Sequence, residues 1–155
     1  MKLRNIVVSA LVVASTMAAV AVAQASPSEG SDPNARAKFV SKIKTQAGGK
    51  KATLKANYRC SEGEALWVSA KQTADGEKDK ALKDEGSSEV AATWLQSHRN
   101  KFTCDGKSRT AKFTIDLVED GSKGKLVEGE AWVQFCVTAG GEDLILSKSG
   151  WVTVK

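Results

Sequence analysis

Apolar and polar residues alternate with a period of two along much of the chain beyond residue 36. Small or apolar side chains alternate mainly with lysines in residues 37–45, and the same alternation returns in residues 52–60 after the Gly48-Gly49 turn. A period of two places successive side chains on opposite faces of a strand. The pattern predicts a β-hairpin with one buried face and one cationic face.

Further segments with this period are separated by turns that contain glycine. The alternation predicts five more strands, in residues 66–71, 110–117, 131–137, 144–146 and 151–154. In the second of these the inward residues are expected to include Leu117. Short strands at close intervals, joined by glycine-containing turns, favour an all-β fold in which antiparallel sheets form a sandwich.

Two neighbouring stretches depart from this simple pattern. Residues 75–88 are charged with mixed sign, which predicts an exposed loop. Residues 88–98 fit either a short helix with a serine cap or a strand that buries Val90, Ala92 and Trp94. We favour the strand because the neighbouring segments are strands.

The first 25 residues have the pattern of a secretory signal peptide. A basic start with Lys2 and Arg4 precedes the apolar run of residues 6–22 and the small-x-small site Ala23-Gln24-Ala25. The alternative is an uncleaved membrane anchor, because the apolar run is nearly long enough to span a bilayer. Hydroxyl side chains within the run and the cleavage site after it favour residues 1–25 as a cleaved signal peptide.

The remainder of the chain is sufficient for one domain but not for two. Residues 26–35 contain both prolines of the chain together with Ser and Gly, which predicts a flexible leader. We therefore expect residues 36–155 to form a single monomeric domain without a transmembrane segment in the mature form. The signal peptide predicts that this domain is secreted to the extracellular side.

Three cysteines in an exported chain predict one disulfide and one free thiol, with three possible pairings. Cys60 ends a predicted strand and Cys104 precedes the Asp105-Gly106 turn, whereas Cys136 lies inside a strand. This placement favours the pair Cys60 and Cys104 over the other two pairings. Alternation places the thiol of Cys136 away from the main core, where an inert thiol, an intermolecular disulfide or a redox-sensitive site all remain open.

Two of the cysteines lie in short motifs. Tyr58-Arg59-Cys60 ends one predicted strand, and Thr103-Cys104-Asp105-Gly106-Lys107 precedes another. Over residues 36–155 these motifs and their spacing resemble a family of small secreted actinobacterial proteins of unknown function. The resemblance implies export, an immunoglobulin-like β-sandwich of about seven or eight strands and a Cys60–Cys104 bridge, and it implies no activity. Cys136 departs from the two-cysteine pattern of that family.

The sequence lacks the residue sets that common enzymes and metal sites need. His98 is the sole histidine, and no Gly-x-Ser-x-Gly elbow accompanies the many Ser and Thr residues. The acids that follow Asp75 fit the calcium-loop template only at their start, and one histidine with three cysteines does not form a usual zinc set. We therefore expect no enzymatic activity, no metal site and no cofactor.

Basic residues are concentrated in the predicted hairpin. Residues 36–59 contain eight Lys or Arg residues and no Asp or Glu. Alternation places six of these cations on one outward face, namely Lys38, Lys42, Lys44, Lys51, Lys55 and Arg59. Such a face focuses positive potential and suits an anionic extracellular polymer or the cell envelope, although lysines on an exposed strand also serve solubility and protect a sheet edge.

Together these features predict a non-catalytic binding or structural domain. The alternative is a secreted inhibitor that presents residues 75–88 to an extracellular enzyme. An inhibitor loop must be held rigid, and this segment has neither proline nor cysteine to fix it. The binding domain is therefore the preferred hypothesis.

Overall fold

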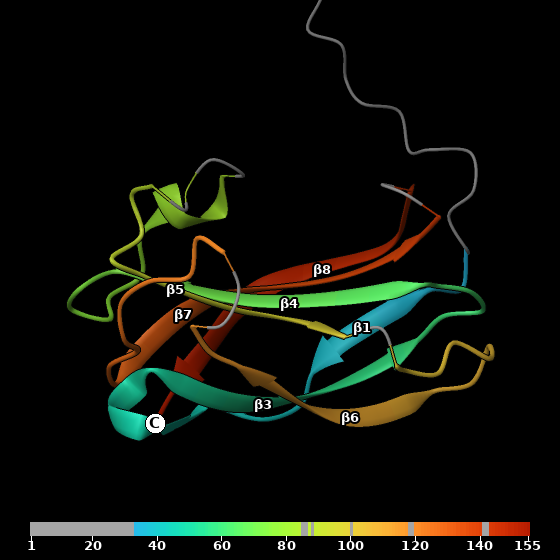
Figure 1. Ribbon diagram of the computed structural model, residues 1–155, viewed down its shortest axis with the longest axis horizontal. Coiled ribbons are helices and arrows are strands. Elements are labelled where there is room, and N and C mark those ends of the chain that lie inside the picture. The colour runs from blue at the N-terminus through green and yellow to red at the C-terminus, as the bar shows by residue number, and fades with distance from the viewer. Residues whose placement is uncertain (1–32, 85–86, 88, 100, 118–119, 141–142) are drawn as a thin grey trace, which may run out of the picture.

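Two antiparallel sheets of four strands each face one another, which confirms the predicted β-sandwich (Figure 1). The computed structural model describes residues 33–84, 87, 89–99, 101–117, 120–140 and 143–155. The predicted signal peptide, residues 1–25, and most of the predicted leader lie outside these residues. No helix in the described part of the chain is long and apolar enough to cross a membrane.

The first sheet, sheet A, is built around one long central strand. Its strands are β1 (Arg36–Phe39), β2 (Lys44–Gln46), β3 (Lys51–Arg59) and β6 (Arg109–Ile115). Strand β6 pairs with one side of β3, while β1 and β2 share its other side. The register places Phe39 opposite Ala56 and Lys44 opposite Thr53. The predicted hairpin therefore exists, but its first arm is divided into two short strands.

The second sheet, sheet B, has the strand order β5-β4-β7-β8. Its strands are β4 (Ala65–Gln72), β5 (Thr93–Arg99), β7 (Gly129–Ala139) and β8 (Asp143–Val154). The segments 144–146 and 151–154, expected as separate strands, are the two ends of the continuous strand β8. Two short 3-10 helices, η1 (Ala47–Gly49) and η2 (Lys80–Lys83), lie in the connections.

The core lies between the inward faces of the two sheets. Tyr58 and Phe113 from sheet A pack with Phe135 from sheet B, with ring centroids 5.5 to 6.3 Å apart. Each such aromatic side chain contributes about 1.5 to 3 kcal/mol through burial.

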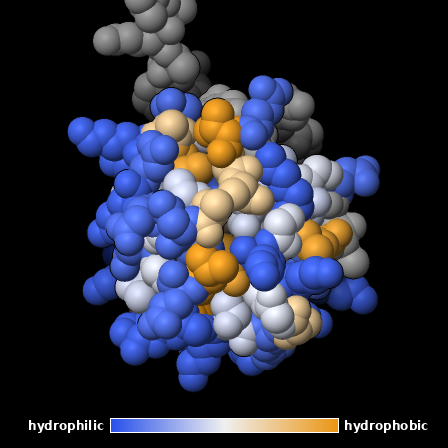
Figure 2. All heavy atoms as spheres, turned by 90° about the vertical axis from the view of Figure 1, so that its left-hand side faces the viewer, coloured by the Kyte–Doolittle hydropathy of each residue, from blue (hydrophilic) through white to orange (hydrophobic). Residues whose placement is uncertain are grey.

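At the end of the sandwich where η1 and η2 lie, the surface consists of hydrophilic residues around a narrow column of apolar ones (Figure 2).

The divided first arm joins the two sheets along one side. Between β1 and β2 the fully buried Ile43 leaves sheet A and pairs in parallel with Val154 of β8. The Ile43 amide donates to the Thr153 carbonyl, and the Lys155 amide donates to the Ile43 carbonyl, each at 2.9 Å. Lys44 then returns to β3. This crossing leaves an interval beside β3 that no strand of sheet A fills.

The strand preferred for residues 88–98 is present as β5, but its predicted inward row is wrong. Val90 is 64% exposed and Ala92 is also exposed. The strand begins only at Thr93, and Leu95, opposite Ala70 of β4, is the side chain that enters the core. Trp94 therefore lies on the outer face of sheet B.

Leu117 of the segment 110–117 was also predicted to lie in the core, but it is 37% exposed. Strand β6 ends at Ile115, and the next residue, Asp116, bridges to Gln96 at the edge of sheet B. The alternation in the sequence continues past the point at which the chain turns from one sheet to the other. Leu117 consequently has no core position to occupy.

Candidate functional site

The outer face of sheet A is cationic across all four strands. Residues directly opposite one another in paired strands point to the same side of a sheet, so the register identifies the members of this face. It carries seven Lys or Arg residues, which we call the cationic face: Arg36, Lys38, Lys44, Lys51, Lys55, Arg59 and Lys112. Five of the six residues predicted from the sequence are among them, and Lys42 is placed differently.

No carboxylate balances these charges within the sheet. Strands β1, β2, β3 and β6 contain no Asp or Glu. Within the described part of the chain the ion pairs join Lys78 to Glu130 and Arg109 to Asp105, and neither includes a member of the cationic face. Neither of these two ion pairs between described residues therefore compensates the charge of the cationic face.

Two pairs of like charges lie directly opposite each other in this sheet. Lys55 of β3 faces Lys112 of β6, and Arg36 of β1 faces Arg59 of β3. Like charges at such positions destabilise a sheet, whereas opposite charges stabilise it by about 0.2 to 1 kcal/mol. The sheet thus maintains an electrostatic arrangement that is unfavourable for folding.

A pocket of about 450 Å³ opens on this face where the chain crosses between β1 and β2. We call it the lysine pocket, and its lining consists of Val40, Ser41, Lys42, Lys44, Thr53, Leu54, Lys55 and Lys112. Four lysines and two hydroxyl groups therefore surround one hollow of the size that binds small ligands or one repeat of a polymer. Such a lining is chemically suited to anionic groups.

Local hydrogen bonds hold the wall of the lysine pocket in place. The Val40 amide donates to the Lys55 carbonyl at 2.9 Å, and the Lys55 amide donates to Ser41 Oγ at 2.8 Å. The Ser41 hydroxyl in turn donates to the Lys42 carbonyl at 3.0 Å. The serine side chain thus replaces a backbone acceptor at the point where the ladder between β1 and β3 ends.

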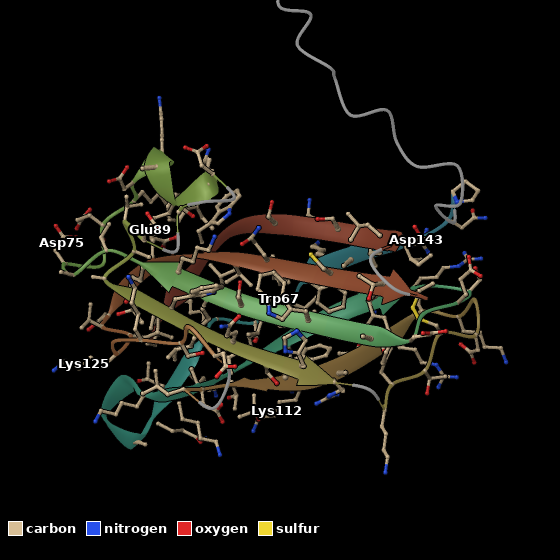
Figure 3. The ribbon with its side chains drawn as sticks, turned by 45° about the horizontal axis from the view of Figure 1, so that its top comes forward. Trp67, Asp75, Glu89, Lys112, Lys125 and Asp143 are labelled. Atoms are coloured by element: carbon tan, nitrogen blue, oxygen red, sulfur yellow. A yellow bond between two sulfur atoms is a disulfide. The ribbon has the colours of Figure 1, made fainter. Side chains whose placement is uncertain are left out.

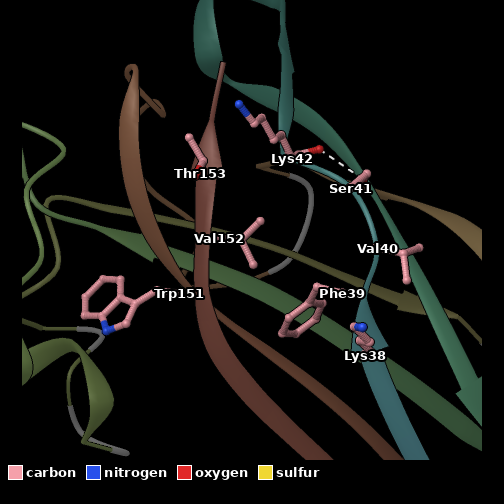
Figure 4. A pocket seen from close by; sticks show the side chains of 8 residues that line it. All are labelled: Lys38, Phe39, Val40, Ser41, Lys42, Trp151, Val152 and Thr153. Carbon is pink, nitrogen blue, oxygen red and sulfur yellow. Dashed lines mark hydrogen bonds between the residues drawn. The ribbon is translucent and has the colours of Figure 1, made fainter.

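Lys42 lies on the crossing segment and not on the regular sheet. It lines the lysine pocket and also a second pocket of about 560 Å³ on the other side of the segment, beside Trp151 and Thr153 (Figure 4). Lys155 lies beside Lys42 and lowers its pKa, while the charge of Glu130 acts in the opposite direction.

Sequence reasoning missed Arg36 and Lys112 as members of the face. Arg36 was visible as a basic residue of the same segment, and Lys112 alternates with the inward Phe113. Only the pairing of β6 with β3 brings Lys112 opposite Lys55. Arg109, the other cation of β6, is paired with Asp105, whose pKa it holds below the usual value.

The favoured cysteine pairing is confirmed. Cys60, at the end of β3, forms a disulfide with Cys104, with their Cα atoms 4.7 Å apart. The bridge ties the end of the central strand of sheet A to the connection that leads into β6. The Gly106 amide also donates to the Cys60 carbonyl at 2.8 Å, so the same turn is fastened by backbone and side chain.

Cys136 is a free, half-buried thiol on the outer face of sheet B, away from the core as alternation predicted. Its sulfur lies 3.8 Å from Ser147 Oγ. Burial raises the pKa of this thiol, and the Ser147 contact only partly opposes that effect. The thiolate that oxidation or disulfide exchange requires is therefore disfavoured at neutral pH.

His98 lies on β5, beside Trp67, with the ring centroids 6.4 Å apart. Among the residues that the structure describes, no three His, Cys, Asp or Glu side chains lie close enough together to hold a metal ion.

No family model and no curated protein matches this chain. Similar solved structures include the C-terminal domain of wzt, which is 18% identical over 81% of each chain, with a TM-score of 0.32. Another is β-glucosidase 3B from Thermotoga neapolitana in complex with α-D-glucose, which is 13% identical with a TM-score of 0.23. That match covers 76% of this chain and 16% of the glucosidase chain. At these TM-scores neither structure bears on what this chain does.

Proposed function

We propose that this protein is a secreted, non-catalytic domain that binds an anionic polymer through the cationic face and the lysine pocket. The observation that supports this proposal most directly is the pair Lys55 and Lys112, which face each other across a sheet without any carboxylate. A chain under selection for stability alone would place an acid at one of these positions. A bound polyanion supplies the missing negative charge.

The arrangement suits a polymer better than a single small anion. The cations extend from Arg36 on β1 to Lys112 on β6, and the lysine pocket lies within this area. A polyanion that contacts several of these cations releases condensed counterions, which gives strong binding at low salt. The lysines act as point charges, while the guanidinium groups of Arg36 and Arg59 can each bind a carboxylate or phosphate with two hydrogen bonds.

Export is supported by the disulfide. Structural disulfides persist in oxidising compartments and are rare where thioredoxin and glutathione keep thiols reduced. The Cys60–Cys104 bridge is therefore compatible with the extracellular location that residues 1–25 predict. An anionic polymer of the cell envelope or the extracellular medium is the partner that this location offers.

A secreted inhibitor remains the second candidate, because residues 75–84 are held more firmly than their composition predicts. Leu82 of η2 is buried, and Asp79 caps the helix by accepting from the Ala81 amide at 2.9 Å. A fixed segment loses less entropy on binding an enzyme. Weak binding to polyanions, together with inhibition that depends on this segment, would favour the inhibitor.

The experiment compares heparin binding by the chain without residues 1–25 and by two matched triple variants at several salt concentrations. The first variant removes charge from the lysine pocket through Lys42→Gln, Lys55→Gln and Lys112→Gln. The control removes the same charge elsewhere through Lys80→Gln, Lys101→Gln and Lys125→Gln. We expect the pocket variant to lose at least tenfold in affinity and the control to lose less than threefold, with similar melting temperatures.

Two outcomes would contradict the proposal. In one, wild-type protein binds neither heparin nor polyphosphate at low salt. In the other, the two triple variants bind alike, which would show that only net charge matters and that the cationic face is a solvated strand surface. Binding that is insensitive to salt would also argue against an electrostatic polymer site.

A further inference from the structure

All four tryptophans of the chain lie on the outer face of sheet B. Trp132 of β7 is opposite Trp151 of β8, and their rings meet edge to face with centroids 5.3 Å apart. Trp94 lies on β5 in the same row across the sheet, and Trp67 lies on β4 nearer the other end. Large aromatic side chains on the outside of a sandwich are outside the core that the fold needs, so their placement calls for another explanation.

Half of this face is covered by the chain itself. The ammonium groups of Lys71, Lys78 and Lys83 lie over the rings of Trp94, Trp151 and Trp132, at 5.7, 6.0 and 5.4 Å from the ring centroids. The Lys71 ammonium also donates to Ser87 Oγ at 2.8 Å. Residues 78–83, anchored by the buried Leu82, thus close the end of the face that carries these three tryptophans.

The other half of the face, which we call the platform, surrounds Trp67 and lies beyond these lysines. Trp67 is half-buried there, and Ser69 and Gln96 beside it are buried. Figure 3 looks onto this sheet and shows Trp67 near its middle. The Trp67 indole nitrogen donates to Gln96 Oε1 at 3.1 Å, and Gln96 Nε2 donates to the Asp120 carbonyl at 2.7 Å. This chain of hydrogen bonds fixes the orientation of the indole ring before any ligand arrives.

Polar atoms beside Trp67 are buried without a hydrogen-bond partner in the described structure. Ser69 is fully buried on this face, directly opposite Gln134, and neither Ser69 Oγ nor Gln134 Oε1 has a partner. A buried polar atom without a partner is unfavourable for the folded chain. Ser69 Oγ is out of reach of a ligand, but Gln134 is half-buried and its amide can turn about the side-chain torsions to pair with a ligand hydroxyl above the sheet.

From this geometry we propose that the platform around Trp67 binds an uncharged polysaccharide. A pyranose ring has an apolar face of C–H groups, which packs on an indole, and a rim of hydroxyls, which pair with amides and hydroxyls. The outward side chains of this half of the sheet include no Lys, Arg, Asp or Glu: Trp67, Ser69, Gln96, His98, Gln134, Cys136, Ser147 and Ser149. An uncharged surface of this composition matches a neutral ligand, and it does not depend on the cationic face.

The test is affinity electrophoresis of the chain without residues 1–25 in gels that contain dextran, mannan or laminarin. We expect retardation by at least one of these neutral polysaccharides, a loss of at least tenfold in affinity in Trp67→Ala, and a smaller loss in the milder variant Gln134→Ala. Trp151→Ala removes the same residue type from the covered half, and its affinity should stay within twofold of wild type. Near-ultraviolet circular dichroism confirms that each variant is folded.

Several results would overturn this proposal. Wild-type protein that none of the three polysaccharides retards would exclude the platform as a site for them, whatever the outcome of the heparin experiment. Equal retardation of Gln134→Ala, Trp67→Ala and wild type would place the binding elsewhere. A wild-type dimer in sedimentation that Trp67→Ala converts to a monomer would show that the platform joins two copies of this chain instead.

Discussion

The two outer faces of this sandwich use lysine in opposite ways. On sheet A, Lys55 and Lys112 face each other and raise the energy of the folded chain. On sheet B, Lys78 and Lys83 lie over Trp151 and Trp132, where a cation over an aromatic ring contributes about 0.5 to 1 kcal/mol at exposed sites. Lysines that stabilise the fold are thus separated from lysines that do not, and the second kind forms the face that we propose binds an anionic polymer.

The largest expected effect comes from removing the disulfide. In the chain-entropy model, Cys60→Ser costs about 4 kcal/mol of the free energy of unfolding, because the bridge closes a segment of 44 residues. The bridge lies at the end of β3, so hydrogen exchange should show sheet A losing more protection than sheet B. Cys136→Ser serves as the control, and urea unfolding should show a change below about 1 kcal/mol. Equal loss of protection in both sheets would contradict this asymmetry.

The next effect concerns the cover of sheet B. Leu82→Ala removes the buried anchor of η2 and should cost about 2 to 4 kcal/mol, because truncation of a buried leucine leaves a cavity. Release of this segment also removes Lys83 from Trp132, so acrylamide should quench the tryptophan fluorescence more strongly. Lys80→Ala, an exposed change in the same helix, is the control. Unchanged quenching in Leu82→Ala would show that the segment stays in place without its anchor.

A smaller effect on the free energy of unfolding is expected in sheet A, where the facing lysines are proposed to favour binding at the expense of stability. Lys112→Glu creates an attractive pair with Lys55 and should raise stability by about 0.5 kcal/mol while weakening heparin binding several-fold. Lys125→Glu makes the same charge change outside this sheet and should alter both quantities less. Thermal unfolding and a heparin titration measure the two effects. A fall in stability in Lys112→Glu would show that the facing lysines do not repel each other significantly.

The smallest effect comes from the thiol on sheet B. Burial raises the folded-state pKa of Cys136 above its unfolded value, so its contribution to stability is fully present below the unfolded pKa and is lost as pH rises through the folded pKa. Urea unfolding between neutral and alkaline pH should therefore show a decline that Cys136→Ser reduces. Alkylation of Cys136 by iodoacetamide at neutral pH should be slower than alkylation of the amino acid cysteine in solution. Rapid alkylation of the folded protein would contradict the shielded thiol.

Alternation in the sequence revealed most strands and most of the cationic face, because a period of two fixes which side of its own strand each residue occupies. It did not reveal that Lys112 lies opposite Lys55, since alternation within one strand contains no information about which other strand is its neighbour. The inward row of β5 was wrong for a related reason. The period continues through Val90 and Ala92, but only the hydrogen-bonded ladder decides that the strand begins at Thr93.

The sequence pattern did not predict the lysine pocket, because the pocket forms where the first arm of the hairpin is interrupted between β1 and β2. Residues 37–45 alternate as though they formed one strand, yet the chain departs from β3 at Ser41 and returns at Lys44. The departure occurs because Ile43 reaches a fully buried position beside β8. The period of two is the same before and after the crossing, so the sequence pattern does not show that the chain changes from one sheet to the other.

The crossing at Ile43 also has a kinetic consequence. The Thr45 side chain, two residues further on, donates to the Lys155 carbonyl at 3.2 Å across a sequence separation of 110 residues. Contacts between such distant segments form slowly, because a long stretch of chain must close before they provide any stabilisation. The segment that lines the lysine pocket is therefore expected to reach its native position late in folding, after strands that are close in sequence, such as β7 and β8, have paired. Refolding that is monitored by the recovery of heparin binding should therefore be slower than refolding that is monitored by circular dichroism of the backbone.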